Sequence, residues 1–276
     1  LGGVRRDWTK DYGRPDRHCK TEMKKQIPNV ITCCNLISGC IATCFAFFHS
    51  PELALLWIII GAVFDFFDGM SARLLHVSSP IGKELDSLAD DVTFGVAPST
   101  ILFSQLIVMD FPNALSGIAD YVPFVAYIMA AFSALRLAKF NLDERQTMGF
   151  IGLPTPANAL FWGSLIVSLN NWLCNLPQGW LILVVMIFVS SWLLVSEIPM
   201  FALKFKHWGW QGNQLRYSFI IISAVIVIGS IVMSAVNGSN LPSDLFMGFL
   251  RPWWIVIMLY LVLSIVKDLA LQESKQ

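Results

Sequence analysis

Four aspartates lie in a part of the chain that is otherwise apolar enough to enter a lipid bilayer. They are Asp65, Asp68, Asp86 and Asp90. An ionised carboxylate is costly in hydrocarbon, so four of them need a counter-charge or a water-filled cavity. The members of each pair are three or four residues apart and therefore project from one face of a helix. If the two helices face each other, hard oxygen ligands converge in the way that suits Mg²⁺ or Mn²⁺. The sequence thus predicts a metal site at a membrane surface.

The composition also predicts a membrane protein. Hydrophobic residues make up 55% of the 276 residues, charged residues make up 14%, and the mean hydropathy is +0.62. This balance excludes an ordinary soluble domain. We expect an all-α, polytopic bundle of about eight transmembrane helices. The apolar segments that predict them are Ile27–Phe48, Leu53–Leu75, Leu85–Val108, Tyr121–Phe140, Thr155–Leu173, Trp180–Pro199, Tyr217–Val236 and Pro252–Ala270.

The distribution of basic residues predicts the orientation of the bundle. Of the nineteen Lys and Arg residues, eight precede the first apolar segment, and only Arg251 falls on the opposite side of the membrane from the rest. The positive-inside rule makes the basic side cytoplasmic, so both termini and the aspartates are expected there. No cleavable signal peptide is expected, because the first apolar run is longer than the apolar region of a signal sequence.

Three parts of the chain follow from this pattern. We expect residues 1–26 to form a basic cytoplasmic arm that lies on anionic lipid headgroups. Residues 27–206 form the core that carries the aspartates, and residues 207–276 form the C-terminal transmembrane helices and a short tail. The basic arm does not indicate a nucleic-acid partner, since topology and attraction to the membrane surface explain it better.

The aspartates belong to a longer pattern of fixed spacing, D-x2-D-G-x2-A-R-x8-G-x3-D-x3-D. Its other fixed positions are Gly69, Ala72, Arg73 and Gly82. At every fixed position the pattern resembles the motif of the CDP-alcohol phosphatidyltransferases. The alternative is an ion-pair network in a transporter bundle, but such a network does not require small residues at these offsets.

The resemblance implies a reaction and roles for the aspartates. Members of this family attack CDP-diacylglycerol, or a similar CDP-alcohol, with the hydroxyl of a second alcohol and release CMP. By resemblance, Asp65, Asp68 and Asp86 are the primary ligands of two divalent ions. Asp90 would complete the second metal site and act as general base on the incoming hydroxyl. The neighbouring Asp91 points to another face of the helix and is left outside the core site.

The resemblance also implies a place for the nucleotide. Small residues that let a cytosine ring or a ribose approach the backbone are Gly69, Ala72 and Gly82. Arg73 suits a phosphate oxygen or a structural carboxylate. The first apolar segment contains the Pro-Asn-x-x-Thr pattern that the family has near the nucleotide. Pro28 alone is ordinary at a helix start, so Asn29 and Thr32, about one turn apart, are the candidate nucleotide contacts.

The choice of acceptor alcohol rests on other positions. Family members that use phosphorylated acceptors usually have Arg where this chain has Asn35, and loss of the guanidinium disfavours a phosphorylated acceptor. Three segments resemble the phosphatidylserine synthase branch of the family, at residues 135–141, 150–157 and 196–204. That branch more often has Arg where Lys139 stands, so a bidentate role is not expected there.

Two cations and one amide near the end of the fourth apolar segment are candidate acceptor or phosphate contacts. Arg136 and Lys139, one helical turn apart, could bind the carboxylate of serine or the phosphates of the lipid. Their alternative role is as positive-inside anchors. Asn141 is a candidate polar contact or a cap at a helix end.

We therefore expect an integral protein of a bacterial cytoplasmic membrane, active at the cytoplasmic side, that makes phosphatidylserine and CMP from CDP-diacylglycerol and L-serine. Direct attack is expected, because no activated Ser, Cys or His accompanies the carboxylates. The expected cofactor is Mg²⁺ or Mn²⁺, and the expected partners are the two substrates and membrane lipids, with a homodimer left open. The alternatives are a sister transferase using glycerol 3-phosphate or another alcohol, and a cation-coupled transporter.

Overall fold

The computed structural model describes residues 15–77, 79–112, 117–142, 150–201, 210, 213–238 and 240–273. This part of the chain is almost entirely helical, which confirms the all-α class. Its α-helices are α1 (Pro15–Phe47), α2 (Pro51–Leu74), α3 (Pro80–Asp90), α4 (Ala97–Ile107), α5 (Tyr127–Leu142), α6 (Thr155–Asn175), α7 (Gly179–Val195), α8 (Gln214–Asn237), α9 (Leu241–Leu250) and α10 (Trp253–Glu273). A π-helical segment, η1 (Asp91–Val96), joins α3 to α4, and a 3₁₀ segment, η3 (Ala119–Ala126), leads into α5.

Five helical stretches in the described residues are long and apolar enough to cross a membrane by length and composition. They are Gln26–Phe47, Pro51–Leu74, Ala119–Leu142, Gln214–Asn237 and Leu241–Leu269. Helix α7 is apolar but shorter. These stretches support an integral membrane protein, whereas the count of eight spans and the cytoplasmic placement of both termini remain predictions.

Helix α1 begins before the predicted first span. It starts at Pro15 rather than at Ile27 and continues without interruption to Phe47. The second part of the predicted basic arm is therefore helical, while residues 1–14 of that arm lie outside the described residues.

The segment predicted as a single helix, Leu85–Val108, is divided into α3, η1 and α4. A π-helical turn holds one residue more than an α-helical turn and is frequent at functional sites. Thr93 of η1 is fully buried and lies against Gly39 of α1 and Gly61 of α2. A Cβ atom at either glycine would collide with Thr93. No proline interrupts Asp91–Val96, so the sequence did not indicate the change.

Helix α9 lies in a stretch that the sequence assigns to a connection between the last two spans. Its ten residues are too few to cross a bilayer alone. Pro242 lies in its first turn, and Asp244 accepts a hydrogen bond from the backbone N–H of Asn240 at 2.8 Å, whereas the side chain of Asn240 makes no capping hydrogen bond.

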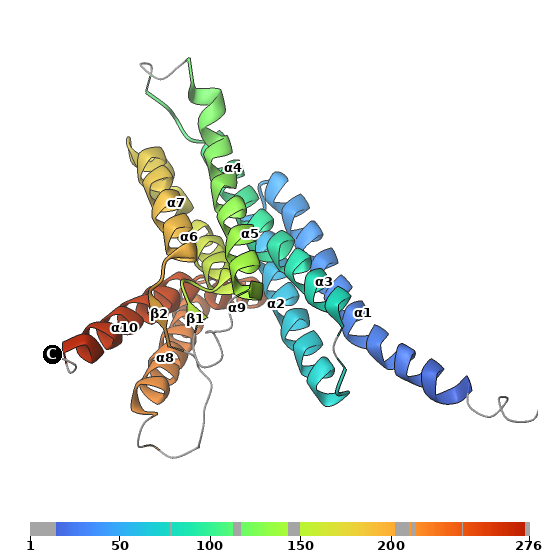
Figure 1. The fold of residues 1–276 in the computed structure, drawn as a ribbon. Coiled ribbons are helices and arrows are strands. Elements are labelled where there is room, and N and C mark those ends of the chain that lie inside the picture. The colour runs from blue at the N-terminus through green and yellow to red at the C-terminus, as the bar shows by residue number, and fades with distance from the viewer. Residues whose placement is uncertain are drawn as a thin grey trace, which may run out of the picture.

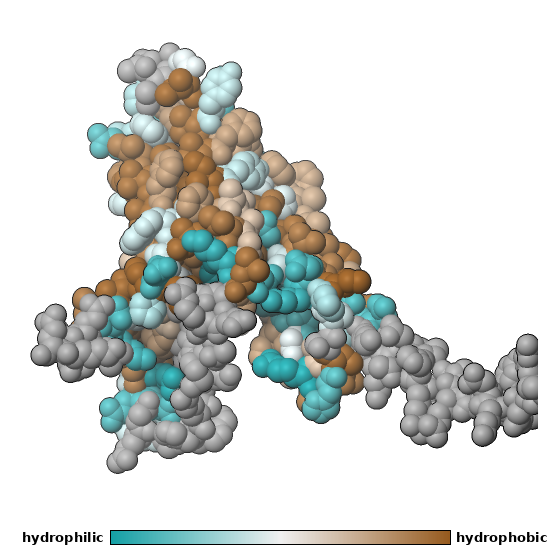
Figure 2. Space-filling view, in the orientation of Figure 1, coloured by the Kyte–Doolittle hydropathy of each residue, from teal (hydrophilic) through white to brown (hydrophobic). Residues whose placement is uncertain are grey.

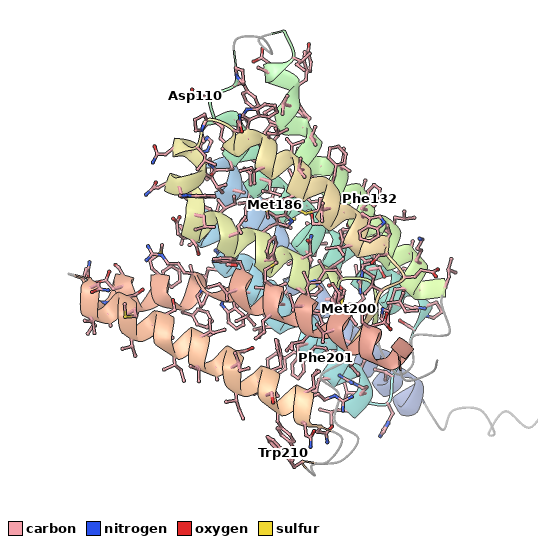
Figure 3. The ribbon with its side chains drawn as sticks, turned by 90° about the vertical axis from the view of Figure 1, so that its left-hand side faces the viewer. Asp110, Phe132, Met186, Met200, Phe201 and Trp210 are labelled. Carbon is pink, nitrogen blue, oxygen red and sulfur yellow. The ribbon has the colours of Figure 1, made fainter. Side chains whose placement is uncertain are left out.

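The helices form one bundle with an oblique C-terminal pair. Figure 1 shows α1, α2 and α3 along one side, α6 and α7 on the other, and α4 and α5 between them. Helix α1 packs against α2, α3 and α4, and α6 packs against α2, α4 and α10. Figure 3 shows α8 and α10 beside each other and across the other helices, with Phe201 between them. In Figure 2 the hydrophobic surface covers the upper helices, and hydrophilic residues gather lower down, towards the ends of α2 and α3.

Two short strands bring together two of the segments that resemble the serine-using branch. β1 (Phe150–Ile151) pairs antiparallel with β2 (Pro199–Met200). The following residue, Gly152, has φ of +75°, and a Cβ atom there would lie 2.6 Å from the carbonyl oxygen of Leu194. Only glycine adopts this conformation in that space without strain.

Candidate metal and nucleotide site

Three of the four motif aspartates converge from two helices. Asp65 and Asp68 lie on α2, Asp86 lies on α3, and each offers a carboxylate oxygen within 4.8 Å of the others. A tight connection turns the chain between the two helices. His76 has a left-handed φ of +52°, and Ser79 caps α3 by accepting a hydrogen bond from the N–H of Gly82 at 2.9 Å.

Asp68 is the most enclosed of these carboxylates. Its side chain is buried, and its Oδ2 lies 2.6 Å from the hydroxyl of Thr32 on α1, which donates to it. Thr32 is expected from the sequence to contact the nucleotide. The structure places its hydroxyl on a carboxylate of the cluster, so Thr32 also fixes the orientation of Asp68.

Asp90 lies outside the group of three. It follows Asp86 by one helical turn on α3, and its Oδ1 accepts a hydrogen bond from Nδ2 of Asn35 at 3.0 Å. It is close enough to Asp65 and Asp86 to interact with them electrostatically. Its helix, α3, and the following segment η1 both contact α5, the helix that carries Arg136.

The donor set fits divalent cations. Carboxylates from two helices supply hard oxygen ligands at one point, and Oδ1 of Asp86 is buried without a hydrogen-bond partner among the described residues. A buried carboxylate oxygen with no donor is costly unless a cation meets it. The chemistry of these side chains agrees with Mg²⁺ or Mn²⁺ and not with a metal that prefers nitrogen or sulfur ligands.

A cavity of about 330 Å³ opens beside the carboxylates. It is lined by Pro28, Asn29, Thr32, Asp68, Gly69, Ala72, Val77, Ser79, Gly82, Lys83 and Asp86. The structure thus brings together five of the predicted nucleotide contacts, from three helices. At Gly82 a Cβ atom would lie 3.1 Å from Oδ1 of Asn29 and 3.0 Å from Oγ of Ser79, so a side chain there would close this wall.

Two of the lining residues that were not expected from the sequence are polar or charged. Lys83 places a cation at the cavity, and Ser79 places a hydroxyl there. The Ser79-Pro80 pair is a recognisable helix start, and Lys83 directly follows the last glycine of the motif. These signals could have indicated both residues.

Other predicted residues are engaged elsewhere or stand apart from the cavity lining. Nε of Arg73 donates to the carbonyl oxygen of Gly69, one turn back on α2, at 2.9 Å. Asn141 ties α5 to α3: its Nδ2 donates to Oγ of Ser87 at 2.7 Å, and its carbonyl oxygen accepts from Nζ of Lys83 at 2.8 Å. Lys139 is exposed near the end of α5.

Arg136 is a predicted acceptor residue that is buried on α5, the helix that contacts α3 and η1. Its side chain is 7% exposed, and its Nε has no hydrogen-bond partner among the described residues. It lies on α5 within electrostatic range of Asp90 and of Tyr260 on α10. A buried guanidinium with an unused donor is suited to a negatively charged ligand.

Known proteins share the region that carries these residues. The model of the CDP-alcohol phosphatidyltransferase family matches residues 25–204. A Bacillus subtilis protein named CDP-diacylglycerol–serine O-phosphatidyltransferase is 37% identical over 186 residues, which cover 66% of this chain and 90% of the relative. A Methanocaldococcus jannaschii protein of the same name is 35% identical over 203 residues, which cover 74% of this chain and 84% of the relative. A Mycobacterium leprae protein of that name is 31% identical over 185 residues, which cover 63% of this chain and 57% of the relative.

Proposed function

We propose, for a chain that belongs to the CDP-alcohol phosphatidyltransferase family, that it transfers the phosphatidyl group of CDP-diacylglycerol to the hydroxyl of L-serine. The products are phosphatidylserine and CMP. The observation that carries the proposal is the convergence of Asp65, Asp68 and Asp86 beside the cavity, with Asp90 one helical turn beyond Asp86 on α3. The names of the relatives agree with serine as the acceptor.

The carboxylates would hold two divalent ions, Mg²⁺ or Mn²⁺. Asp65, Asp68 and Asp86 are the proposed primary ligands, and Asp90 is proposed to complete the second site. When bound, the ions would neutralise the pyrophosphate and the negative charge that develops during transfer. Thr32 keeps Asp68 in place through its hydrogen bond, and the short turn before Ser79 holds α3 beside α2.

The cavity would take the cytidine nucleotide. Asn29 and Thr32 would provide polar contacts from α1. The small residues of the motif leave room for the sugar and the base. Lys83 would meet a phosphate oxygen, and Arg73 could reach one by leaving its contact with the Gly69 carbonyl.

The transfer step assigns a proton to Asp90. The serine hydroxyl oxygen attacks the phosphorus that carries the diacylglycerol, and the bond between that phosphorus and the bridging pyrophosphate oxygen breaks. CMP leaves with the electron pair of that bond. The carboxylate of Asp90 takes the hydroxyl proton, so charge and atoms balance.

Arg136 would select the acceptor by binding its carboxylate. Serine carries a hydroxyl and a carboxylate on adjacent carbons, so one small molecule can meet Asp90 and Arg136 at once. The guanidinium could form a bidentate pair with that carboxylate. Lys139 and Asn141 are proposed as weaker contributors to the same end of the site, or to the lipid phosphates.

The test is CMP release by purified protein supplied with CDP-diacylglycerol, Mg²⁺ or Mn²⁺, and one acceptor at a time. We expect CMP with serine and little with glycerol 3-phosphate at the same concentration. Preference for glycerol 3-phosphate would overturn the acceptor and keep the transferase. A protein that moves a cation or solute but releases no CMP with any acceptor would favour the transporter alternative.

A second experiment tests the proposed base. Asp90→Asn should lower kcat far more than it raises the KM for CDP-diacylglycerol, because proton removal and not nucleotide binding is lost. Glu84→Gln, the same change of charge at an exposed position of α3, is the matched control and should keep normal turnover. A loss confined to nucleotide binding would make Asp90 a ligand only.

A further inference from the structure

Asn35 of α1 lies directly against the proposed base. Its side chain is fully buried, and its Nδ2 donates to Oδ1 of Asp90 at 3.0 Å. An ionised carboxylate can only accept hydrogen bonds, so the nitrogen end of the amide must face Asp90. The oxygen end faces Gly61 of α2, where a Cβ atom would lie 3.0 Å from Oδ1. The hydrogen bond to Asp90 therefore fixes the orientation of the amide, while its Oδ1 is buried without a hydrogen-bond partner among the described residues.

The backbone at Asn35 is held by the π-helical segment. The hydroxyl of Thr93 donates to the carbonyl oxygen of Asn35 at 3.0 Å. Thr93 reaches that position only because Gly39 and Gly61 have no side chains: a Cβ atom at Gly61 would lie 2.5 Å from Cγ2 of Thr93, and one at Gly39 would overlap its hydroxyl. Helix α1, helix α2 and the π-helical segment η1 thus meet around Asn35.

We propose that Asn35 is a positioning residue of the transferase, with Thr93 in support; this inference rests on the proposed function. A carboxylate attached through a single bond can rotate, and a base that rotates spends less time facing the hydroxyl it must deprotonate. The amide of Asn35 holds Oδ1, which leaves the other oxygen of Asp90 to face the acceptor. It does so without adding a positive charge that would compete for the proton.

The position also restricts which side chain can serve. Gly61 lies close to the amide, since a Cβ atom there would come within 3.0 Å of Oδ1 of Asn35. A longer cationic side chain at position 35 would need to leave this space or displace Asp90. Asn35 is therefore expected to set the direction of the base without placing a cation next to it.

The alternative is that Asn35 only fills space between helices, and two substitutions separate the roles. Asn35→Leu keeps a similar volume and removes the donor, while Thr93→Val keeps the shape and removes the hydroxyl that holds the Asn35 backbone. Ser38→Ala is the matched control, because Ser38 is also buried on α1 but bonds only to the Cys34 carbonyl.

We expect Asn35→Leu to lower kcat with serine by about tenfold or more, the usual effect of losing a partner that orients a reactive group. The KM for CDP-diacylglycerol should change by less than about threefold, since the nucleotide cavity is untouched. Thr93→Val should lower kcat in the same direction by a smaller factor, and Ser38→Ala should leave it unchanged. Monodisperse elution and an unchanged melting temperature confirm that each variant is folded.

Normal kcat in Asn35→Leu would overturn the proposal, as would a loss that appears only in the KM for CDP-diacylglycerol or that Ser38→Ala reproduces. If Asn35→Leu does not fold, Thr93→Val decides: an unchanged kcat overturns the proposal and a lowered one supports it. If the wild type releases CMP with another alcohol but not with serine, the acceptor assignment fails, and the same ratios measured with that alcohol decide the role of Asn35. A wild type inactive with every alcohol overturns both.

Discussion

The region formed by α1, α2 and η1 buries different kinds of side chain from the C-terminal helix α8. In α1, α2 and η1, fully or almost fully buried residues include Thr32, Asn35, Asp68 and Thr93, and each takes part in a hydrogen bond. In α8 the only buried residue is Phe219, and apolar side chains such as Ile221 and Val225 are exposed. Buried polar groups are costly without partners, whereas an apolar surface is stable in lipid. The first region is therefore built around buried polar side chains, whereas α8 presents apolar side chains to its surroundings.

Helix α10 stands between these two extremes. Its buried face includes Val256, Ile257 and Leu261, and it packs against α6. The Tyr260 hydroxyl donates to the carbonyl oxygen of Phe201 at 3.0 Å, and Tyr260 also lies within electrostatic range of Arg136. The C-terminal part lies beyond residues 25–204, where the family model matches, yet α10 packs against α6 and β2, which lie within the matched region.

The largest expected effect is the loss of a ligand in the polar region. Asp68→Asn keeps the size of the side chain and removes a charged ligand, so CMP release should fall by at least about 100-fold. EDTA should have the same effect on the wild type, reversed by Mg²⁺ or Mn²⁺. Asp120→Asn, the same change at an exposed position, is the control. Normal turnover by a folded Asp68→Asn protein would show that Asp68 is not an essential metal ligand.

Arg136→Ala should have the next largest effect. Loss of a charge-assisted contact worth about 2 kcal/mol should raise the KM for serine by roughly thirtyfold. The measurement is CMP release as a function of each substrate, with Lys267→Ala, an exposed cation on α10, as control. A rise in the KM for CDP-diacylglycerol instead of serine would place the guanidinium on the lipid phosphates.

Tyr260→Phe tests the intermediate helix. The change removes one buried hydrogen bond and should lower the free energy of unfolding by about 1 kcal/mol. Thermal unfolding in detergent measures the effect, and Tyr121→Phe, at an exposed tyrosine, should show none. A fall in serine turnover without a fall in melting temperature would show that Tyr260 acts on Arg136 and not only on the packing of α10.

The smallest effect is expected on α8. Val225→Ala should change the free energy of unfolding by less than about 0.5 kcal/mol in a bilayer, because its side chain is 65% exposed. Val256→Ala on α10, where the same side chain is 3% exposed, should cost at least about 1 kcal/mol. A larger loss at Val225 than at Val256 would contradict the comparison and indicate that α8 packs against another chain, as a homodimer would require.

The sequence predicted the aspartate cluster because fixed offsets on two helices carry their own geometry. Asp65, Asp68 and Asp86 needed only the helical period and a short turn to converge. The same reasoning placed Asn29 and Gly82 beside one cavity, where the structure has them. In each case the information lies within a few turns of helix or in a motif of known spacing.

Contacts between distant segments could not be predicted in this way. Asn35 drew attention only as a position without Arg, and its bond to Asp90, 55 residues away, depends on how closely two glycines let three elements approach. The role of Asn141 remained open between a ligand contact and a helix cap, and the structure joins its side chain to Ser87 instead. Helix α9 was not predicted, because its ten residues are too few to stand out as a membrane span.

The π-helical segment also has a consequence for how this protein can change over time. Consecutive residues of an α-helix differ in direction by about 100°, so an extra residue in one turn rotates everything beyond it by that angle. The segment Asp91–Val96 thus sets the angle between the carboxylates of α3 and the buried side chains with which α4 packs in the bundle. Deletion of a single residue there would rotate α4 relative to α3. Substitutions that keep the length of the segment would leave the side chains of α3 and of α4 free to change independently.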